Sequence, residues 1–390
     1  MTEAYIAAAK RSPIGKLNGA LSGLSAAEIG AQVIAGLLAE KDVDPAALDD
    51  VLIGQVLQGG AGQNPARQAA MGAGIPAQVP AMTLNMVCGA GQRSIHLAAQ
   101  AIRAGDAGLV LAGGQDSMTA APHILHSRAP RKMGDQMARD MMILDGLWDA
   151  FHDVHMGVTV EHLARRYQIT RDEQDRFAAA SQHKAGLAKA AGRPDAEIVP
   201  IRTGAADTDH VCSADEHPKP DTTLDQLAAM PPVFDPDGTI TAGNASGLND
   251  GAAAVLVGSE KRLRENGLAP LARIASYASA ALDPMDMGLG PAVASRTALQ
   301  RAGWTAADLD VLEINEAFAA QSIAVNREMG WDTSIINPNG GAIALGHPLA
   351  GSGNRIVVSL LHEMLRTGAK KGLAALCIGG GQGVAICLEA

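Results

Sequence analysis

Short apolar runs alternate with helix-like stretches along the chain, and this alternation predicts an α/β fold. The apolar run at residues 5–10 is typical of a short buried strand. The helix-like stretches at residues 26–40 and 292–303 each precede a strand-like segment, at residues 50–52 and 310–312 respectively. Such a pattern favours helices packed on buried sheets over an all-β sandwich.

The two ends of the chain resemble each other. Residues 108–115 read GLVLAGGQ and residues 375–382 read ALCIGGGQ. Asp50-Val51-Leu52 is likewise matched by Asp310-Val311-Leu312, and the two pairs occur in the same order. Two matches in register predict a duplicated α/β unit. Equivalent strand ends of the two halves would then surround a pseudo-twofold axis, where a site could draw residues from both.

A stretch of different character separates the halves. Thr170-Arg171-Asp172-Glu173 has the spacing of a capping box and should begin a helix that ends near Ala191. Asp235-Pro236-Asp237-Gly238 predicts a turn between two short strands, at residues 233–234 and 239–240. We therefore predict an N-terminal α/β half (1–118 with 250–268), a loop domain covering the site (119–249) and a C-terminal α/β half (269–390).

Composition limits the possible functions. The 390 residues are 47% hydrophobic but only 3% aromatic, with 44 glycines, so the cores must use small aliphatic side chains in close contact. A net charge of −10 argues against a nucleic-acid partner. The sequence has no signal peptide and no apolar run of about 20 residues, so we expect no contact with a membrane.

Cysteine usage indicates a reducing, cytoplasmic compartment, because no C-x-x-C pairing occurs. The four cysteines lie far apart: Cys88, Cys212, Cys377 and Cys387. Residues of metal-ligand type gather in one loop-like segment: His210, Cys212, Asp215 and His217. Their spacing fits no zinc pattern, so we predict no metal ion.

Cys88 is the first candidate for chemistry. It follows a strand-like segment, residues 82–87, and precedes Gly89-Ala90-Gly91 and a helical pattern. Unpaired N–H groups at such a helix N-terminus favour a thiolate and could bind an oxyanion. A packed structural cysteine is the alternative.

Three further candidates sit where a strand or a glycine-rich turn meets a helix or loop. His347 lies on a glycine-rich turn before a helix expected to start near Ser352, and it could activate a thiol as a base. Cys377 ends an apolar strand and precedes three glycines; it is either reactive or a buried hydrophobe. Asn315 ends the strand at residues 311–314. Its amide could orient a water or a carbonyl, or it could cap a helix opened by Glu316-Ala317-Phe318. Met156 and Met287, taken alone, are more typical of core filler.

Together these segments resemble the thiolase family over nearly the whole chain. The matching stretches, in chain order, are Asn85-Met86-Val87-Cys88-Gly89, His155-Met156-Gly157, Thr241-Ala242-Gly243-Asn244-Ala245-Ser246-Gly247, Asn315-Glu316-Ala317-Phe318, Gly346-His347-Pro348 and Cys377-Ile378-Gly379-Gly380-Gly381-Gln382-Gly383. The resemblance implies two duplicated α/β halves in a five-layered αβαβα body, with an inserted loop domain.

The resemblance also implies the chemistry, a reversible Claisen condensation or thiolytic cleavage between acyl-CoA thioesters. Cys88 would be the acylated nucleophile and His347 the base that deprotonates it, while Cys377 would move the α-proton of the second acyl-CoA. One oxyanion hole would use His347 and a water held by Asn315. The other would use the backbone N–H groups of Cys88 and Gly379.

Binding roles are implied in the same way. Ser246 would contact the pantetheine arm, Lys219 would supply a cation near CoA, and His155 would contact the substrate. Met156, Met287 and Phe318 would line the acyl pocket. Coenzyme A would be a substrate and no cofactor is implied. Family members are dimers or tetramers, and residues 126–142 resemble the segment through which tetramers associate.

The sequence departs from the family pattern in two places. After Cys88 the family usually has Gly or Ser and then Ser-Gly-Leu or Ser-Gly-Met, whereas this chain has Gly89-Ala90-Gly91-Gln92-Arg93. After Gly346-His347-Pro348 the usual Gly two residues on is Ala350, and Asn354 replaces a small residue. These changes leave the predicted catalytic residues in place but bear on acyl-chain preference.

Two rivals compete with a thiolase, for which we expect acetyl-CoA C-acetyltransferase or else a medium- or broad-chain 3-oxoacyl-CoA thiolase. One is a condensing synthase, which would pair one cysteine with two histidines or with His and Asn. The other is a thiolase-like acyl-CoA binder without catalysis. The presence of Cys377 beside Cys88 and His347 argues against both.

Overall fold

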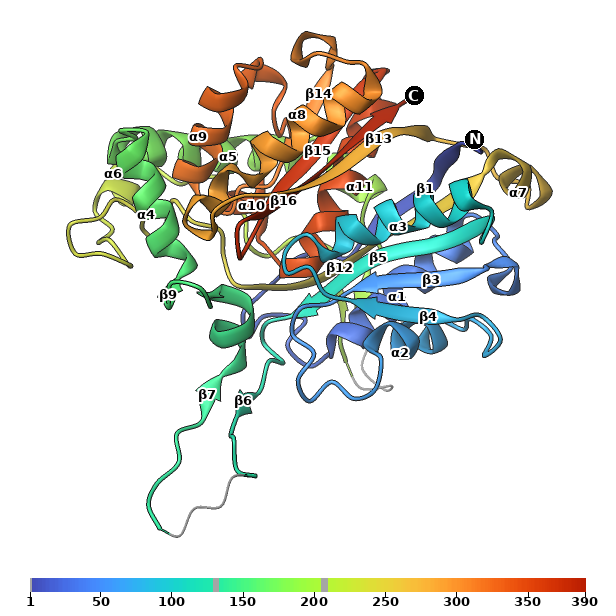
Figure 1. Cartoon of the computed structure of the whole chain (residues 1–390), viewed down its shortest axis with the longest axis horizontal. Helices are drawn as coiled ribbons and strands as arrows, with labels where there is room; N and C mark the ends of the chain where they lie inside the picture. Colours follow the sequence, from blue (N-terminus) through green and yellow to red (C-terminus); the bar gives the residue numbers. More distant parts are fainter. Residues whose placement is uncertain (1, 129–132, 205–209) are drawn as a thin grey trace.

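The computed structural model describes residues 2–128, 133–204 and 210–390. Within these residues one mixed sheet of ten strands runs in the order β14-β15-β16-β13-β1-β12-β5-β3-β4, with β2 paired to β12 (Figure 1). Its strands are β1 (Ala4–Arg11), β2 (Gly15–Lys16), β3 (Asp50–Gly54), β4 (Ala81–Leu84), β5 (Leu109–Ser117), β12 (Asn249–Ser259), β13 (Ala272–Ala281), β14 (Val311–Ile314), β15 (Lys371–Ile378) and β16 (Gln382–Glu389).

The sheet consists of two halves built alike, which confirms the predicted duplication. In one half β3 is parallel to β5, and β12 and β1 follow antiparallel; in the other β14 is parallel to β15, and β16 and β13 follow antiparallel. The halves join where β1 pairs with β13 through Tyr5 and Ile6. The helices that accompany the sheet are α1 (Ala26–Glu40), α2 (Pro65–Gly72), α3 (Ala90–Ala104), α7 (Glu260–Glu265), α8 (Gly290–Ala302), α9 (Ala319–Met329), α10 (Ala342–Leu345) and α11 (Leu349–Thr367).

Three hydrophobic cores show the five layers. The largest buries α3 and α11 between the two half-sheets, with residues such as Ile95 and Val357. A second core packs α1 on the outer face of the N-terminal half, and a third packs α8 on the outer face of the C-terminal half (Figure 1). The predicted αβαβα body is therefore correct.

Helices α3 and α11 cross at very short range because glycines line their contact. A Cβ atom at position 91 would lie 2.2 Å from the carbonyl oxygen of Ala350, and one at position 114 would lie 2.2 Å from the same atom. At position 353 it would lie 3.0 Å from the carbonyl oxygen of Cys88. No side chain larger than hydrogen fits at these positions without moving backbone. The N-terminal ends of the two helices consequently touch.

The departures from the family pattern serve this interface between the layers. Gln92 is fully buried and its Nε2 donates to the carbonyl oxygen of Ala374 at 2.9 Å. Asn354 Nδ2 donates to the carbonyl oxygens of Gly91 and Ala112, at 3.3 Å each. These amide side chains join α3 and α11 to each other and to the strands beside them.

Between β5 and β12 the chain forms the loop region. Its elements are β6 (His123–Ile124), β7 (Arg139–Asp140), β8 (Trp148–Asp149), β9 (Val154–His155), α4 (Met156–Arg166), α5 (Arg171–Ala190), β10 (Ile201–Arg202), β11 (Val211–Cys212) and α6 (Leu224–Ala228). The capping box at the start of α5 is present, with Thr170 accepting from the N–H of Glu173. The domain boundaries remain a prediction.

The turn predicted at residues 235–238 is present, since the N–H of Gly238 donates to the carbonyl oxygen of Asp235, but the two short strands predicted beside it, at residues 233–234 and 239–240, are not. The reason is the buried carboxylate of Glu161, whose Oε1 accepts the N–H groups of Thr239 and Ile240 at 2.8 Å each. A side chain thus takes the backbone donors that a neighbouring strand would otherwise satisfy.

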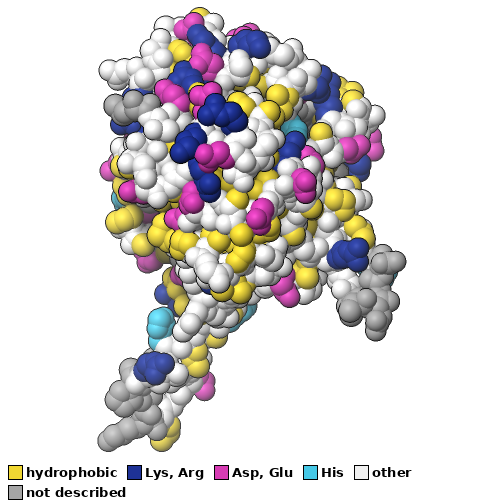
Figure 2. Space-filling view, turned by 90° about the vertical axis from the view of Figure 1, so that its right-hand side faces the viewer, with side chains coloured by type: hydrophobic (Ala, Val, Ile, Leu, Met, Phe, Trp, Pro, Cys, Tyr) yellow, Lys and Arg dark blue, Asp and Glu magenta, His cyan; other side chains and the backbone are white. Residues whose placement is uncertain are grey.

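Strands β6 and β7 pair with each other and extend away from the body in both Figure 1 and Figure 2. Met133 and Met137 beside them are 93% and 83% exposed. The predicted association segment at residues 126–142 includes positions 129–132, which lie outside the described residues. Among the described residues no helix combines the length and apolar character required to cross a membrane.

Candidate active site

A cavity of about 360 Å³ opens between the body and the loop region. All but two of the predicted site residues line it: Cys88, His155, Met156, Ser246, Met287, Phe318, His347, Cys377 and Gly379. Asn315 is fully buried and does not line the cavity. Lys219 is exposed in the loop region outside it. The structure therefore gathers both cysteines and the histidine from opposite ends of the chain into one site.

A strained turn presents Cys88. Strand β4 ends at Leu84, three residues before the predicted end, because Val87 adopts a left-handed backbone conformation with φ of 45°. The N–H of Val87 donates to Asn85 Oδ1 at 2.8 Å, which holds the turn. At the next position a Cβ atom on Gly89 would lie 2.2 Å from Ile378 Cδ1, so the turn packs directly on the end of β15.

Burial controls the protonation of both thiols. It raises the pKa of Cys88 to about 11, although the backbone N–H groups of Gly379 and of Cys88 itself favour the thiolate. The pKa of Cys377 is also raised, first by burial and then by its proximity to Cys88. The local N–H groups favour the thiolate, as expected at a helix N-terminus, but desolvation has the larger effect on the pKa of Cys88. Each sulfur needs a partner that takes its proton.

His347 can be that partner for Cys88. Its backbone N–H donates to Asn249 Oδ1 at 2.9 Å, and its Nδ1 lies 2.5 Å from Ser352 Oγ. Burial, with a smaller contribution from the positive charge of Arg355, lowers the pKa of His347 to about 3. The imidazole is therefore neutral near pH 7 and able to accept a proton. Helix α11 begins at Leu349 rather than near Ser352, which leaves Ser352 in its first turn.

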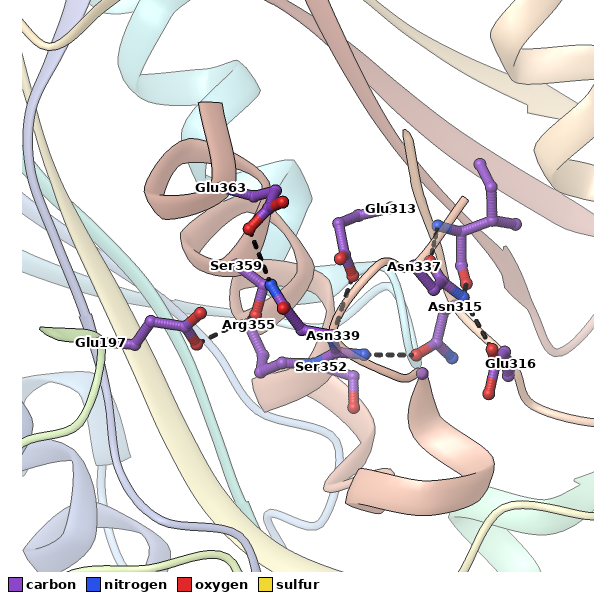
Figure 3. Close-up of polar contacts among 12 residues, drawn as sticks. Glu197, Glu313, Asn315, Glu316, Asn337, Asn339, Ser352, Arg355, Ser359 and Glu363 are labelled. Carbon is purple, nitrogen blue, oxygen red and sulfur yellow. Dashed lines mark hydrogen bonds and ion pairs between the residues drawn. The ribbon is translucent and has the colours of Figure 1, made fainter. Parts of the chain in front are cut away.

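Asn315 does not cap a helix. Helix α9 begins at Ala319, and residues 316–318 are not helical, so the predicted helix start was three residues too early. The cause is that Glu316 is buried and accepts hydrogen bonds from Ser181 Oγ and Asn337 Nδ2, at 2.6 and 2.8 Å. Its carboxylate ties this segment to α5 through Ser181, and to Asn337, a contact drawn in Figure 3.

An aromatic cluster forms one wall of the cavity. Phe234 stacks on His155, with ring centroids 4.5 Å apart, and meets Phe318 edge to face at 6.2 Å. Leu147 and Ile143 add apolar surface from the loop region. The sequence interpretation missed Phe234, Leu147 and Ile143, because nothing in an irregular loop sequence indicates that its apolar residues face a cavity.

The loop region brings polar groups to the same cavity. The N–H of Ser246 donates to the carbonyl oxygen of Ala317 at 3.0 Å, which fixes Ser246 beside Phe318. His217 packs so closely on the cavity residue Gly247 that a Cβ there would lie 2.3 Å from its ring. Burial, then the charge of Lys219, lowers the pKa of His217 to about 4, so Lys219 is near this side of the site.

Comparison with known proteins decides the family. The family model "Thiolase, N-terminal domain" matches residues 4–261, and "Thiolase, C-terminal domain" matches residues 268–390. The chain belongs to the thiolase family. This membership favours the thiolase interpretation over the condensing synthase and the non-catalytic binder.

Named relatives of this thiolase are similar along their whole length. This chain is 55% identical over 391 residues to an acetyl-CoA acetyltransferase of Cupriavidus necator, with 100% of both chains covered. It is 55% identical to the enzyme of that name from Pseudomonas aeruginosa, covering 100% of this chain and 99% of the relative.

Solved thiolase structures agree with the fold. The acetyl-CoA acetyltransferase of Bacillus anthracis superposes with a TM-score of 0.97 at 43% identity, covering 100% of this chain and 99% of the other. Human mitochondrial 3-ketoacyl-CoA thiolase in complex with CoA superposes with a TM-score of 0.96 at 41% identity, covering 100% and 98%.

The raised pKa of Cys88 predicts how this thiolase reacts with an alkylating reagent. Because only the thiolate attacks iodoacetamide, the alkylation rate of Cys88 should rise about tenfold per pH unit from pH 7 to 9. Peptide mass spectrometry after timed quenching measures the rate at each pH. A rate that levels off with a midpoint near pH 6 to 7 would instead indicate a resting thiolate–imidazolium pair with His347.

Proposed function

We propose that this thiolase interconverts two acetyl-CoA molecules with acetoacetyl-CoA and free CoA, through an acyl group on Cys88. The observation that carries the proposal is the convergence of Cys88, His347 and Cys377 on one apolar cavity, with the N–H of Gly379 at the Cys88 sulfur. The names of the relatives at 55% identity support an acetyl substrate.

The first half-reaction transfers an acyl group to Cys88. In the cleavage direction His347 takes the Cys88 proton as the sulfur attacks the 3-oxo carbon of the substrate. Ser352 beside Nδ1 would orient the ring so that Nε2 receives this proton. The N–H groups of Cys88 and Gly379 are the donors available to the oxyanion, because both already lie close to the sulfur.

Breaking the carbon–carbon bond leaves an enolate of acetyl-CoA. Cys377 is protonated at rest, so it can donate its proton to the enolate carbon. The thioester oxygen of the enolate would be stabilised by the imidazolium of His347 and by a water held by Asn315. CoA–SH then attacks the acyl–Cys88 thioester and loses its proton to the Cys377 thiolate. Cys88 leaves as a thiolate and regains the proton from His347, which restores the starting state.

The walls of the cavity bear on the choice of acyl group. Met156, Met287 and Phe318 are all at least nine-tenths buried and would surround the acyl chain. We propose that Ser246 and His155 contact the pantetheine arm, and that Lys219 attracts the phosphates of CoA. A 3-oxoacyl-CoA thiolase of medium chain length is the second candidate, since the human 3-ketoacyl-CoA thiolase shares the fold at 41% identity.

Substrate length separates these candidates. CoA-dependent cleavage should be fastest with acetoacetyl-CoA, and kcat/KM should fall by about tenfold or more for 3-oxohexanoyl-CoA and again for 3-oxooctanoyl-CoA. Loss of the ultraviolet absorbance of the 3-oxoacyl-CoA enolate, followed in a spectrophotometer, measures each rate. Cys88→Ala is the control and should show no cleavage. Equal or rising kcat/KM with chain length would favour the second candidate, and no wild-type activity on any substrate would contradict both.

We propose further that the chain works as a homo-oligomer in the reducing cytoplasm, where free thiols persist. The exposed Met133 and Met137 beside β6 and β7 support association through this segment. Light scattering should give a mass of two or four chains, and Met133→Glu with Met137→Glu should halve a tetramer to dimers. A monomeric mass for the wild-type protein would contradict the proposal.

A further inference from the structure

A buried polar network that includes Asn315 joins α11 to the end of β14 (Figure 3). Arg355 of α11 points between Glu313, which lies on β14, and Asn315, which directly follows that strand. Its Nη1 lies 3.3 Å from Glu313 Oε2, and its Nη2 donates to Asn315 Oδ1 at 3.4 Å. Arg355, Glu313 and Asn315 are 2%, 1% and 0% exposed. A guanidinium buried to this degree in a protein core requires a specific partner.

The chemistry of Arg355 decides the orientation of the Asn315 amide. An amide oxygen and an amide nitrogen have nearly the same shape, so packing alone permits either orientation. A guanidinium only donates hydrogen bonds, so the group that faces it must be Oδ1. Asn315 Nδ2 therefore faces away from the guanidinium. It is buried, and it has no hydrogen-bond partner among the described residues.

The same face of α11 serves both parts of the proposed oxyanion hole. Ser352 and Arg355 are three residues apart, so they lie on one side of the helix. Ser352 Oγ contacts His347 Nδ1, while Arg355 contacts Asn315 Oδ1. One rigid helix thereby sets the directions of the histidine ring and of the amide together.

We propose that Arg355 is a positioning residue that holds the amide of Asn315 with Oδ1 toward the guanidinium, leaving Nδ2 as the donor to the oxyanion-hole water. This inference rests on the proposed function. Glu313 contributes to this positioning, because its carboxylate balances the charge of the buried Arg355 guanidinium. Without the guanidinium the amide can turn over and present Oδ1 to the water, which then loses the hydrogen bond from Nδ2 that orients it toward the enolate.

The test separates the two half-reactions. The double variant Arg355→Met/Glu313→Gln removes both charges of the buried pair at once. Its kcat for cleavage of acetoacetyl-CoA should fall on the order of 10²-fold, because misplacing a group that stabilises the transition state has effects of that size. Acylation of Cys88 by acetyl-CoA, followed by exchange of labelled CoA into acetyl-CoA, should fall less than about threefold. This step uses the N–H groups of Cys88 and Gly379 and the base His347, whose pKa is lowered mainly by burial, so the imidazole stays a neutral acceptor without the Arg355 charge.

A double-mutant cycle with Asn315→Ala shows whether Arg355 acts through Asn315. In that background the Arg355→Met/Glu313→Gln change should cause no further loss of cleavage. Arg366→Met, on the exposed end of α11, is the matched control and should leave both reactions unchanged. Thermal melting checks that each variant folds. If the double variant does not fold, Arg355→Lys carries the test, because a lysine can still donate one bond and should retain more cleavage than Asn315→Ala.

The outcomes are distinct. Cleavage and acylation that fall equally, or losses that multiply in the Asn315→Ala background, would overturn the positioning role while the wild-type protein remains a thiolase. Arg355→Lys cleavage as low as that of Asn315→Ala would overturn it as well. A wild-type protein that cannot cleave acetoacetyl-CoA would instead contradict the proposed function.

Discussion

The contact between the N-terminal ends of α3 and α11 is the constraint on which the site depends. Cys88 lies two residues before the start of α3 and His347 two residues before the start of α11, so the two groups can share a cavity only if the helices approach closely. Gly91, Gly114 and Gly353 permit that approach, since a Cβ atom at any of them would meet backbone within 3.0 Å. The fully buried Asp116 strengthens it by accepting N–H groups from both halves, those of Val56 and Leu57 and that of Ala350. Duplication of the α/β unit thus places the starts of two equivalent helices next to each other. The glycines let these helices approach closely enough for residues of both halves to form a single site.

Burial then determines how the chemistry begins. The same packing that excludes water raises the pKa of the Cys88 and Cys377 thiols and lowers the pKa of His347. Both thiols and the imidazole are therefore uncharged at rest. Charge appears only during the reaction, at an oxyanion or an enolate. In the proposed reaction, hydrogen-bond donors held in place beforehand are therefore the main source of stabilisation, because they need no reorganisation as charge develops. The N–H of Gly379 and the network behind Asn315 are the parts of the fold that hold such donors.

The sequence was most informative where the signal is local. The capping box of α5 and strand β14 depend on neighbouring residues and were predicted correctly. Cys88 lies between β4 and α3 and His347 lies before α11, as predicted, although the end of β4 and the start of α11 differ from the prediction by three residues. The residues after Asn315 and the strands beside the 235–238 turn were mispredicted because two buried carboxylates, Glu316 and Glu161, bind backbone or side chains far away in the chain. Phe234 in the cavity wall and the partner of Asn315 likewise depend on long-range packing. Resemblance to a family supplies the catalytic roles, but only coordinates show which side chains orient them.

The most direct test of this account is to find where the acyl group resides. The folded Cys377→Ala protein is mixed briefly with acetyl-CoA, quenched in acid and digested, and the acetylated peptide is identified by mass spectrometry. The account predicts an acetyl group on Cys88 in this variant and in the wild-type protein. Cys88, His347 and the two N–H groups carry out the attack, and without Cys377 the leaving CoA thiolate takes the Cys88 proton from the imidazolium of His347. Failure of the folded variant to acetylate Cys88, or an acetyl group on a different residue of the wild-type protein, would contradict it.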